Sequence, residues 1–89
     1  MKRIYSVSAS IAPDLPQPSA LSVAGSFAFG PFNAAQAYAD KMLPGYEAIP
    51  GGRVERPNLY RFEAINHAQQ LGAVIWVRSG VDFGNTVSV

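Results

Sequence analysis

The sequence has no cysteine and a single histidine, so several kinds of chemistry lack their usual residues. The absence of cysteine excludes a disulfide-stapled scaffold, a thiol nucleophile and a cysteine-ligated zinc module. Charged residues are also scarce: they make up 15% of the chain, against about 25% in an average soluble domain. Seven basic and six acidic residues give a formal net charge of +1. These values exclude a strongly basic nucleic-acid binder and a highly charged disordered chain.

The chain also lacks a hydrophobic run that could span a membrane. Residues 15–39 carry no charge, but prolines and polar side chains interrupt them, and a membrane-spanning helix needs about 20 apolar residues in succession. The segment after the basic residues at 2–3 does not fit a signal peptide, because Ser6, Ser8 and Ser10 interrupt its apolar residues. We therefore expect a cytoplasmic protein with no membrane partner.

The length of 89 residues and the apolar content of 48% are those of one small domain that can bury a core. Within 1–89 we expect four parts: an N-terminal strand at 1–11, a proline-rich loop at 12–19, a core at 20–79 and a C-terminal tail at 80–89. The N-terminal strand is predicted because apolar residues alternate with serines, as on a half-buried strand. The end of the tail, Thr86 to Val89, is a candidate edge strand.

The first half of the core shows strand, helix and strand patterns in succession. Alternation predicts a strand at 21–29, and Asn33 is a candidate N-cap for a helix at 34–43. Short strands are predicted at 46–49 and 53–56, joined as a hairpin by a Pro-Gly-Gly turn. A phosphate-binding loop is not indicated there, because such a loop runs into a helix.

The second half of the core contains an apolar pattern that predicts a helix at 58–71, although 59–62 also fit an extended strand. The apolar residues that recur at helical spacing are Leu59, Phe62, Ile65 and Ala68. A continuous apolar run at 73–77 is typical of a central strand that is covered on both faces. Phe27, Phe29 and Trp76 are accordingly expected in the core.

Together these elements predict a ferredoxin-like fold of the α+β class. Their order is βαββαβ, with an antiparallel or mixed sheet, two helices on one face and an extra N-terminal strand added to the sheet. Such an order does not by itself indicate a function.

No constellation of residues indicates catalysis, a cofactor or a metal ion. His67 lies within the predicted helix, where the only carboxylate one turn away is Glu63, and this pair is typical of a surface contact. The carboxylates are scattered, and the G-x-S-x-G motif of a nucleophilic serine is missing. The sequence therefore predicts a protein that is not an enzyme.

Arginine and aromatic residues gather between residues 53 and 63, where the charge of the chain is concentrated. Arg53, Arg56 and Arg61 fall within nine residues in this segment, interleaved with Tyr60 and Phe62. Arginine and tyrosine are enriched at the centres of protein interfaces, and arginine with aromatics also occurs on single-stranded nucleic-acid sites. We select Arg53, Arg56, Tyr60 and Arg61 as the candidate partner-binding residues; the simpler interpretation is a solvated loop.

The favoured hypothesis is a small non-enzymatic protein-binding domain, an inhibitor or adaptor that docks on a larger protein or nucleoprotein assembly. Phages and mobile elements encode such proteins, and anti-CRISPR proteins fall in this size class. A homodimer is a further option, since the charge-poor residues 15–39 suit close packing. One alternative is an RNA- or single-stranded-DNA-binding module that uses Arg53, Arg56 and Arg61. Another is a small ligand-binding or enzymatic ferredoxin-like dimer, with His67 or a carboxylate in a pocket.

Overall fold

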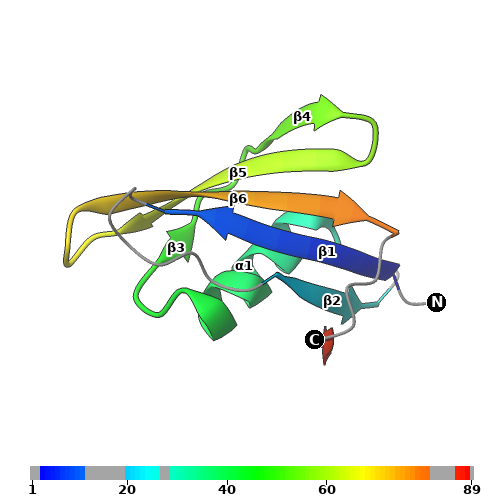
Figure 1. The fold of residues 1–89 in the computed structure, drawn as a ribbon, viewed down its shortest axis with the longest axis horizontal. Coiled ribbons are helices and arrows are strands. Elements are labelled where there is room, and N and C mark those ends of the chain that lie inside the picture. The colour runs from blue at the N-terminus through cyan, green and yellow to red at the C-terminus, as the bar shows by residue number, and fades with distance from the viewer. Residues whose placement is uncertain (1–2, 12–19, 27–28, 81–85, 89) are drawn as a thin grey trace.

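A curled sheet of seven strands and one helix packed against it make up the described part of the chain (Figure 1). The structure is a computed structural model that describes residues 3–11, 20–26, 29–80 and 86–88. In chain order the elements are β1 (Arg3–Ser10), β2 (Leu21–Gly25), α1 (Pro31–Met42), β3 (Glu47–Ala48), β4 (Arg53–Arg56), β5 (Leu59–Asn66), β6 (Leu71–Ser79) and β7 (Thr86–Ser88). No helix in these ranges is long and apolar enough to cross a membrane.

The strand order across the sheet is β3-β5-β6-β1-β2-β7, and β4 pairs with β5 beside β3. Neighbouring strands are antiparallel, except that β7 runs parallel to β2. The strand predicted near the N-terminus is confirmed, but it is not an addition to the sheet. As β1 it lies in the middle, between β6 and β2, and it supplies part of the core. The edge strand predicted at 86–89 is confirmed as β7.

The ferredoxin-like prediction is wrong, because the second helix does not exist. Strand β5 and a turn take its place, and the fold is a mostly-β α+β fold with one helix. From Phe62 to Asn66 buried and exposed residues alternate strictly, and β5 pairs with β6 along its whole length. The turn that follows is closed by the Asn66 Oδ1 atom, which accepts a hydrogen bond from the Gln69 N–H at 3.1 Å. The sequence pattern fitted both periods, and pairing with β6 selects the strand.

The core lies between α1 and the face of the sheet that α1 covers. Helix α1 buries Ala34, Ala35, Tyr38 and Ala39 against the sheet, and three alanines in this set let the helix approach the strands closely. The Tyr5 hydroxyl donates a hydrogen bond to the Phe29 carbonyl oxygen at 3.0 Å. Burial raises the pKa of Tyr38 to about 12, since the charged phenolate is disfavoured away from water. The charge-poor segment of the sequence therefore contributes to packing within the domain.

The edge formed by β3 and β4 differs from the hairpin that the sequence suggested. Both strands lie where they were predicted, but both pair with β5 and not with each other. The Ile49 N–H donates to the Glu63 carbonyl oxygen at 2.8 Å, which keeps the chain alongside β5 between the two strands. The Pro-Gly-Gly segment therefore separates two short strands, β3 and β4, that lie along the same edge of β5. The proline-rich loop at 12–19, Phe27 and the predicted turn at 81–85 lie outside the described residues.

Helix α1 begins earlier than predicted, because Gly30 is its N-cap and Pro31 its first residue, whereas Asn33 lies inside the first turn. Gly30 supplies no side-chain cap, its φ of −107° is accessible to any residue, and a Cβ atom there would have nothing within 4 Å. We expect Gly30→Asp to raise the free energy of unfolding by about 0.5–1 kcal/mol, since a carboxylate would cap a free N–H group and interact with the helix dipole. Urea unfolding would measure this. Gly30→Ala is the control, and an equal result for both variants would contradict the capping argument.

Candidate functional site

The face of the sheet that points away from α1 is the candidate site, and we call it the open face. In Figure 1 this face lies toward the viewer, with α1 behind the strands. Since side chains alternate between the two faces of a strand, the strand register gives its members. The residues at its centre are Ser8, Leu59, Arg61, Trp76 and Arg78, together with Ser6, which is buried.

The register aligns the open-face residues in rows that cross the sheet. In one row Arg53 of β4 lies opposite Arg61 of β5, which lies opposite Trp76 of β6, which lies opposite Ser8 of β1. Directly opposed residues have Cβ atoms about 4.5–5.5 Å apart, close enough for their side chains to touch. Arg61 and Trp76 are therefore direct cross-strand neighbours on the open face.

Trp76 is half-buried and lies on the open face, so its predicted place in the core is wrong. Its neighbours Ile75 and Val77 are fully buried on the α1 side, and alternation then directs Trp76 to the opposite face. The prediction for Phe29 is confirmed, since it is 9% exposed within the core. Strand β6 is central, as predicted, but it is fully covered on one face only.

The open face has an excess of uncompensated positive charge. Among the described residues, Arg61 and Arg78 form no ion pair, while Arg53 pairs with Glu55 through an N···O contact of 2.8 Å. The side chain of Arg53 is 69% exposed, so water screens this pair and its strength is small. Arg53, Arg61 and Glu63 together line a hollow of about 220 Å³. The local charge favours an anionic partner.

The structure brings together three of the four predicted site residues. Arg53, Arg56 and Arg61 share the paired strands β4 and β5, and the register places all three on the open face. Tyr60 does not join them, because it points to the α1 side and packs partly buried against the core. Trp76 and Arg78 were not selected from the sequence.

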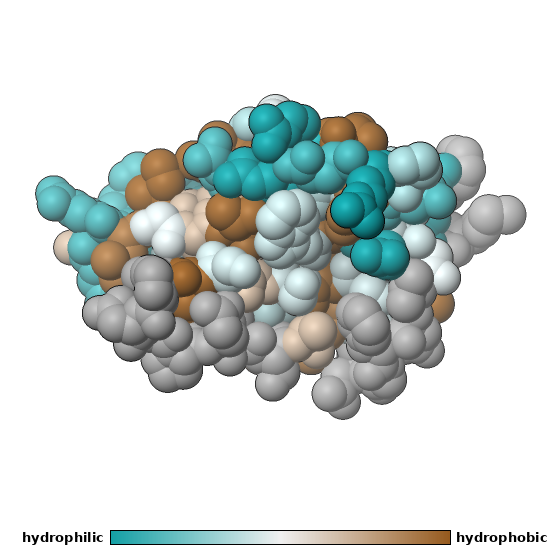
Figure 2. Space-filling model, turned by 45° about the horizontal axis from the view of Figure 1, so that its top comes forward, coloured by the Kyte–Doolittle hydropathy of each residue, from teal (hydrophilic) through white to brown (hydrophobic). Residues whose placement is uncertain are grey.

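Figure 2 shows the molecule with the β4 and β5 side tilted toward the viewer. Hydrophilic side chains gather over that side, and hydrophobic ones lie among them and toward one end of the sheet. This mixed surface resembles the interface regions of proteins, in which apolar anchors are surrounded by polar groups.

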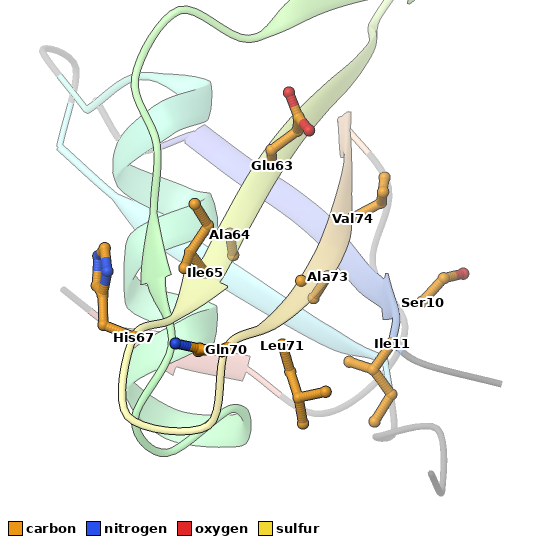
Figure 3. A pocket seen from close by; sticks show the side chains of 11 residues that line it. Ser10, Ile11, Glu63, Ala64, Ile65, His67, Gln70, Leu71, Ala73 and Val74 are labelled. Carbon is orange, nitrogen blue, oxygen red and sulfur yellow. The ribbon is translucent and has the colours of Figure 1, made fainter. Parts of the chain in front are cut away.

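A second hollow, of about 780 Å³, lies at the end of the sheet where β6 extends past β1 (Figure 3). It is lined by Leu71, Val74 and Ile65 together with Glu63 and His67. The Glu63 and His67 side chains point in different directions and do not converge on one point (Figure 3). The predicted contact between these two residues is therefore wrong.

The His67 side chain is 75% exposed, and its Nε2 atom lies 3.8 Å from Glu47 Oε1. In the described part of the chain no three metal-ligating side chains of His, Cys, Asp or Glu gather. Among the described residues that line the second hollow, Glu63 and His67 are thus not placed to act together.

Comparison of the chain with protein families, with curated proteins and with solved structures gives no match. A function can therefore be inferred only from the residues of the open face and their arrangement. The distinguishing feature of this face is a partly exposed tryptophan at the centre of the sheet, near Arg61 and Arg78, which have no carboxylate partner among the described residues.

Proposed function

We propose that this chain is a non-catalytic binding domain that docks the open face of its sheet onto a larger protein. The observation that supports the proposal is the partly exposed Trp76, which has Arg61 directly opposite it on β5 and Arg78 in the neighbouring row. Tryptophan and arginine are enriched among the residues that dominate binding energy at protein interfaces. In this role the domain is an inhibitor or adaptor that occupies a surface of a protein or nucleoprotein assembly.

Burial of Trp76 by a partner would add an apolar contribution to such an interface. A tryptophan side chain buries about 150–250 Å² when it is fully covered. Trp76 is already more than half buried, so a partner that covers the rest would gain on the order of 1–2 kcal/mol at about 25 cal/mol per Å². The arginines around it contribute orientation, because a guanidinium group forms forked hydrogen bonds with carboxylates.

A second candidate function is the binding of single-stranded nucleic acid, and the pairing of Arg61 with Trp76 favours it. Bases stack on aromatic side chains, and arginine adds a cation–π contribution and a phosphate contact. Arg53 and Arg56 would extend the basic surface along β4. Glu55 and Glu63 carry negative charge in the same region, however, and would weaken the attraction for a run of phosphates.

We expect Arg61→Glu and Trp76→Thr each to weaken partner binding on the order of tenfold or more, as for residues at the centre of an interface. Peptides selected from a random displayed library on the wild-type protein would be measured by titration calorimetry against each variant. Threonine keeps the strand propensity at position 76. Lys41→Glu is the matched control, because it reverses one exposed charge on α1, which packs on the other side of the sheet.

Equal affinity of the selected peptides for wild type, Arg61→Glu and Trp76→Thr would show that the open face is not the binding surface. A second titration with short single-stranded DNA and RNA, at low and at physiological salt, tests the nucleic-acid candidate. Affinity for the oligonucleotides that falls steeply with salt, without any selected peptide, would replace the protein-docking proposal.

A further inference from the structure

A small depression lies on the open face beside Trp76, and it spans the row that contains Arg61 and the next row, which contains Arg78. It has a volume of about 250 Å³ and is lined by Ser6, Ser8, Leu59, Trp76 and Arg78. This is less than the roughly 300–1,000 Å³ of sites that hold drug-sized molecules. Its size suits a single inserted side chain.

The lining of this depression has the chemistry of a carboxylate site. Among the described residues that line it, Arg78 is the only charged one, and its guanidinium group forms no ion pair within the same part of the chain. The Ser8 hydroxyl is half-buried and has no hydrogen-bond partner within the same ranges. A carboxylate can accept two parallel hydrogen bonds from a guanidinium group and a further one from a hydroxyl.

Two of the described residues that line the depression are apolar, and they distinguish a side chain from a bare anion. These residues are Leu59 and Trp76, and both would contact the methylene groups of a glutamate side chain. A phosphate group has no such apolar portion. The depression therefore combines an anion-binding group with space for a short aliphatic stem.

We propose that the depression beside Trp76 receives a glutamate or aspartate side chain from an acidic segment of the protein partner. This inference rests on the proposed function and specifies the partner's chemistry. The charge on the open face supports it, since Arg61 and Arg78 both lack a carboxylate partner within the described chain. Isolated carboxylates on a peptide can align with these two arginines and avoid Glu63, which a continuous run of phosphates cannot do.

The single tryptophan of the chain lies in the depression, so its indole N–H resonance reports directly on occupancy. The probe is an N-acetylated, C-amidated peptide of alternating glutamate and threonine, and its counterpart has glutamine in place of glutamate. Both are titrated at constant ionic strength. We expect the glutamate peptide to shift the Trp76 resonance and to bind on the order of tenfold more tightly than the glutamine peptide. Equal binding of the two peptides would overturn the proposal without any mutation of the protein.

Variants at Arg78 test which group holds the carboxylate. Arg78→Gln should remove the preference for the glutamate peptide, and Arg78→Lys should reduce it, because lysine keeps the charge but not the forked geometry. Lys41→Gln, the control on α1, should retain it. A preference unchanged in Arg78→Gln would overturn the assignment.

Two further outcomes separate this inference from the proposed function. If library peptides bind the open face but their affinity is insensitive to Arg78→Gln, the carboxylate site is wrong and the docking face stands. If no peptide binds and a thymidine oligonucleotide shifts the Trp76 resonance, both proposals fail and the basic face is a nucleic-acid site.

Discussion

Phe62→Ala is expected to lower the free energy of unfolding by about 3–5 kcal/mol, whereas Ile65→Ala should cost about 1 kcal/mol or less. Phe62 is 5% exposed on the α1 side of β5, and its ring centroid lies 5.8 Å from that of Phe32. Ile65 is 36% exposed and lies on the open face. Removal of the Phe62 ring leaves a cavity in the core, while truncation of Ile65 removes atoms that already contact water.

The difference between the two variants tests the architecture directly. In a helix at 58–71, residues 62 and 65 would lie three positions apart on the same face, and both substitutions would cost similar amounts. In strand β5 they lie on opposite faces, since their positions in the sequence differ by three, an odd number. Urea unfolding followed by circular dichroism measures both values. Equal losses would contradict β5 as described, and Phe62→Leu provides a milder variant if Phe62→Ala does not fold.

An element could be predicted from the sequence where its apolar residues fit either the helical or the strand period, but not both. The alternation of apolar residues and serine in β1 has no helical reading, and the alanine-rich segment of α1 ends at Pro44-Gly45, which excludes its continuation. Local chemistry determines such elements, so a single sequence is sufficient. The position of β1 in the middle of the sheet could not be predicted, because it depends on pairing with β6, about seventy residues later in the chain.

Strand β5 shows where local patterns are ambiguous. Leu59, Phe62 and Ile65 fit a helical stripe, and Tyr60, Phe62 and Ala64 fit an alternating strand equally well. Phe62 belongs to both sets, and the partner strand β6 decides between them. Tertiary pairing thus overrides a weak local preference.

The candidate site was predictable to the extent that its residues are close in sequence. Arg53, Arg56 and Arg61 could be recognised as a cluster because the short turn between β4 and β5 keeps them together. Trp76 and Arg78 join them through the pairing of β5 with β6. The sequence did contain a signal that Trp76 and Arg78 share the other face of β6. Ile75 and Val77 occupy the buried positions of that strand, so residues 76 and 78 lie on the opposite face. The continuous apolar run from 73 to 77 obscured it.

Gly52→Ala is the other substitution for which we expect a large loss of stability, of about 1–3 kcal/mol. Gly52 lies in the interruption between β3 and β4, directly against the Phe62 ring. A Cβ atom there would come within 2.3 Å of Phe62 Cδ1 and 2.8 Å of the Arg61 carbonyl oxygen. The ring can move only by disturbing the core, and the carbonyl belongs to the backbone of β5. Glycine is therefore needed at this position, because the segment around Gly52 approaches β5 closely.

A double-mutant cycle identifies the cause of this loss. With Phe62→Ala as the background the ring is absent, so Gly52→Ala should cost less than it does in the wild type, and the coupling energy should be at least about 0.5 kcal/mol. Gly72→Ala is the matched control within β6, because the nearest atom to its Cβ would be the Ala64 carbonyl oxygen at 4.0 Å, and we expect it to leave stability nearly unchanged. An equal cost of Gly52→Ala in both backgrounds would show that the ring is not responsible. Such a result would leave the Arg61 carbonyl as the group that requires glycine at position 52.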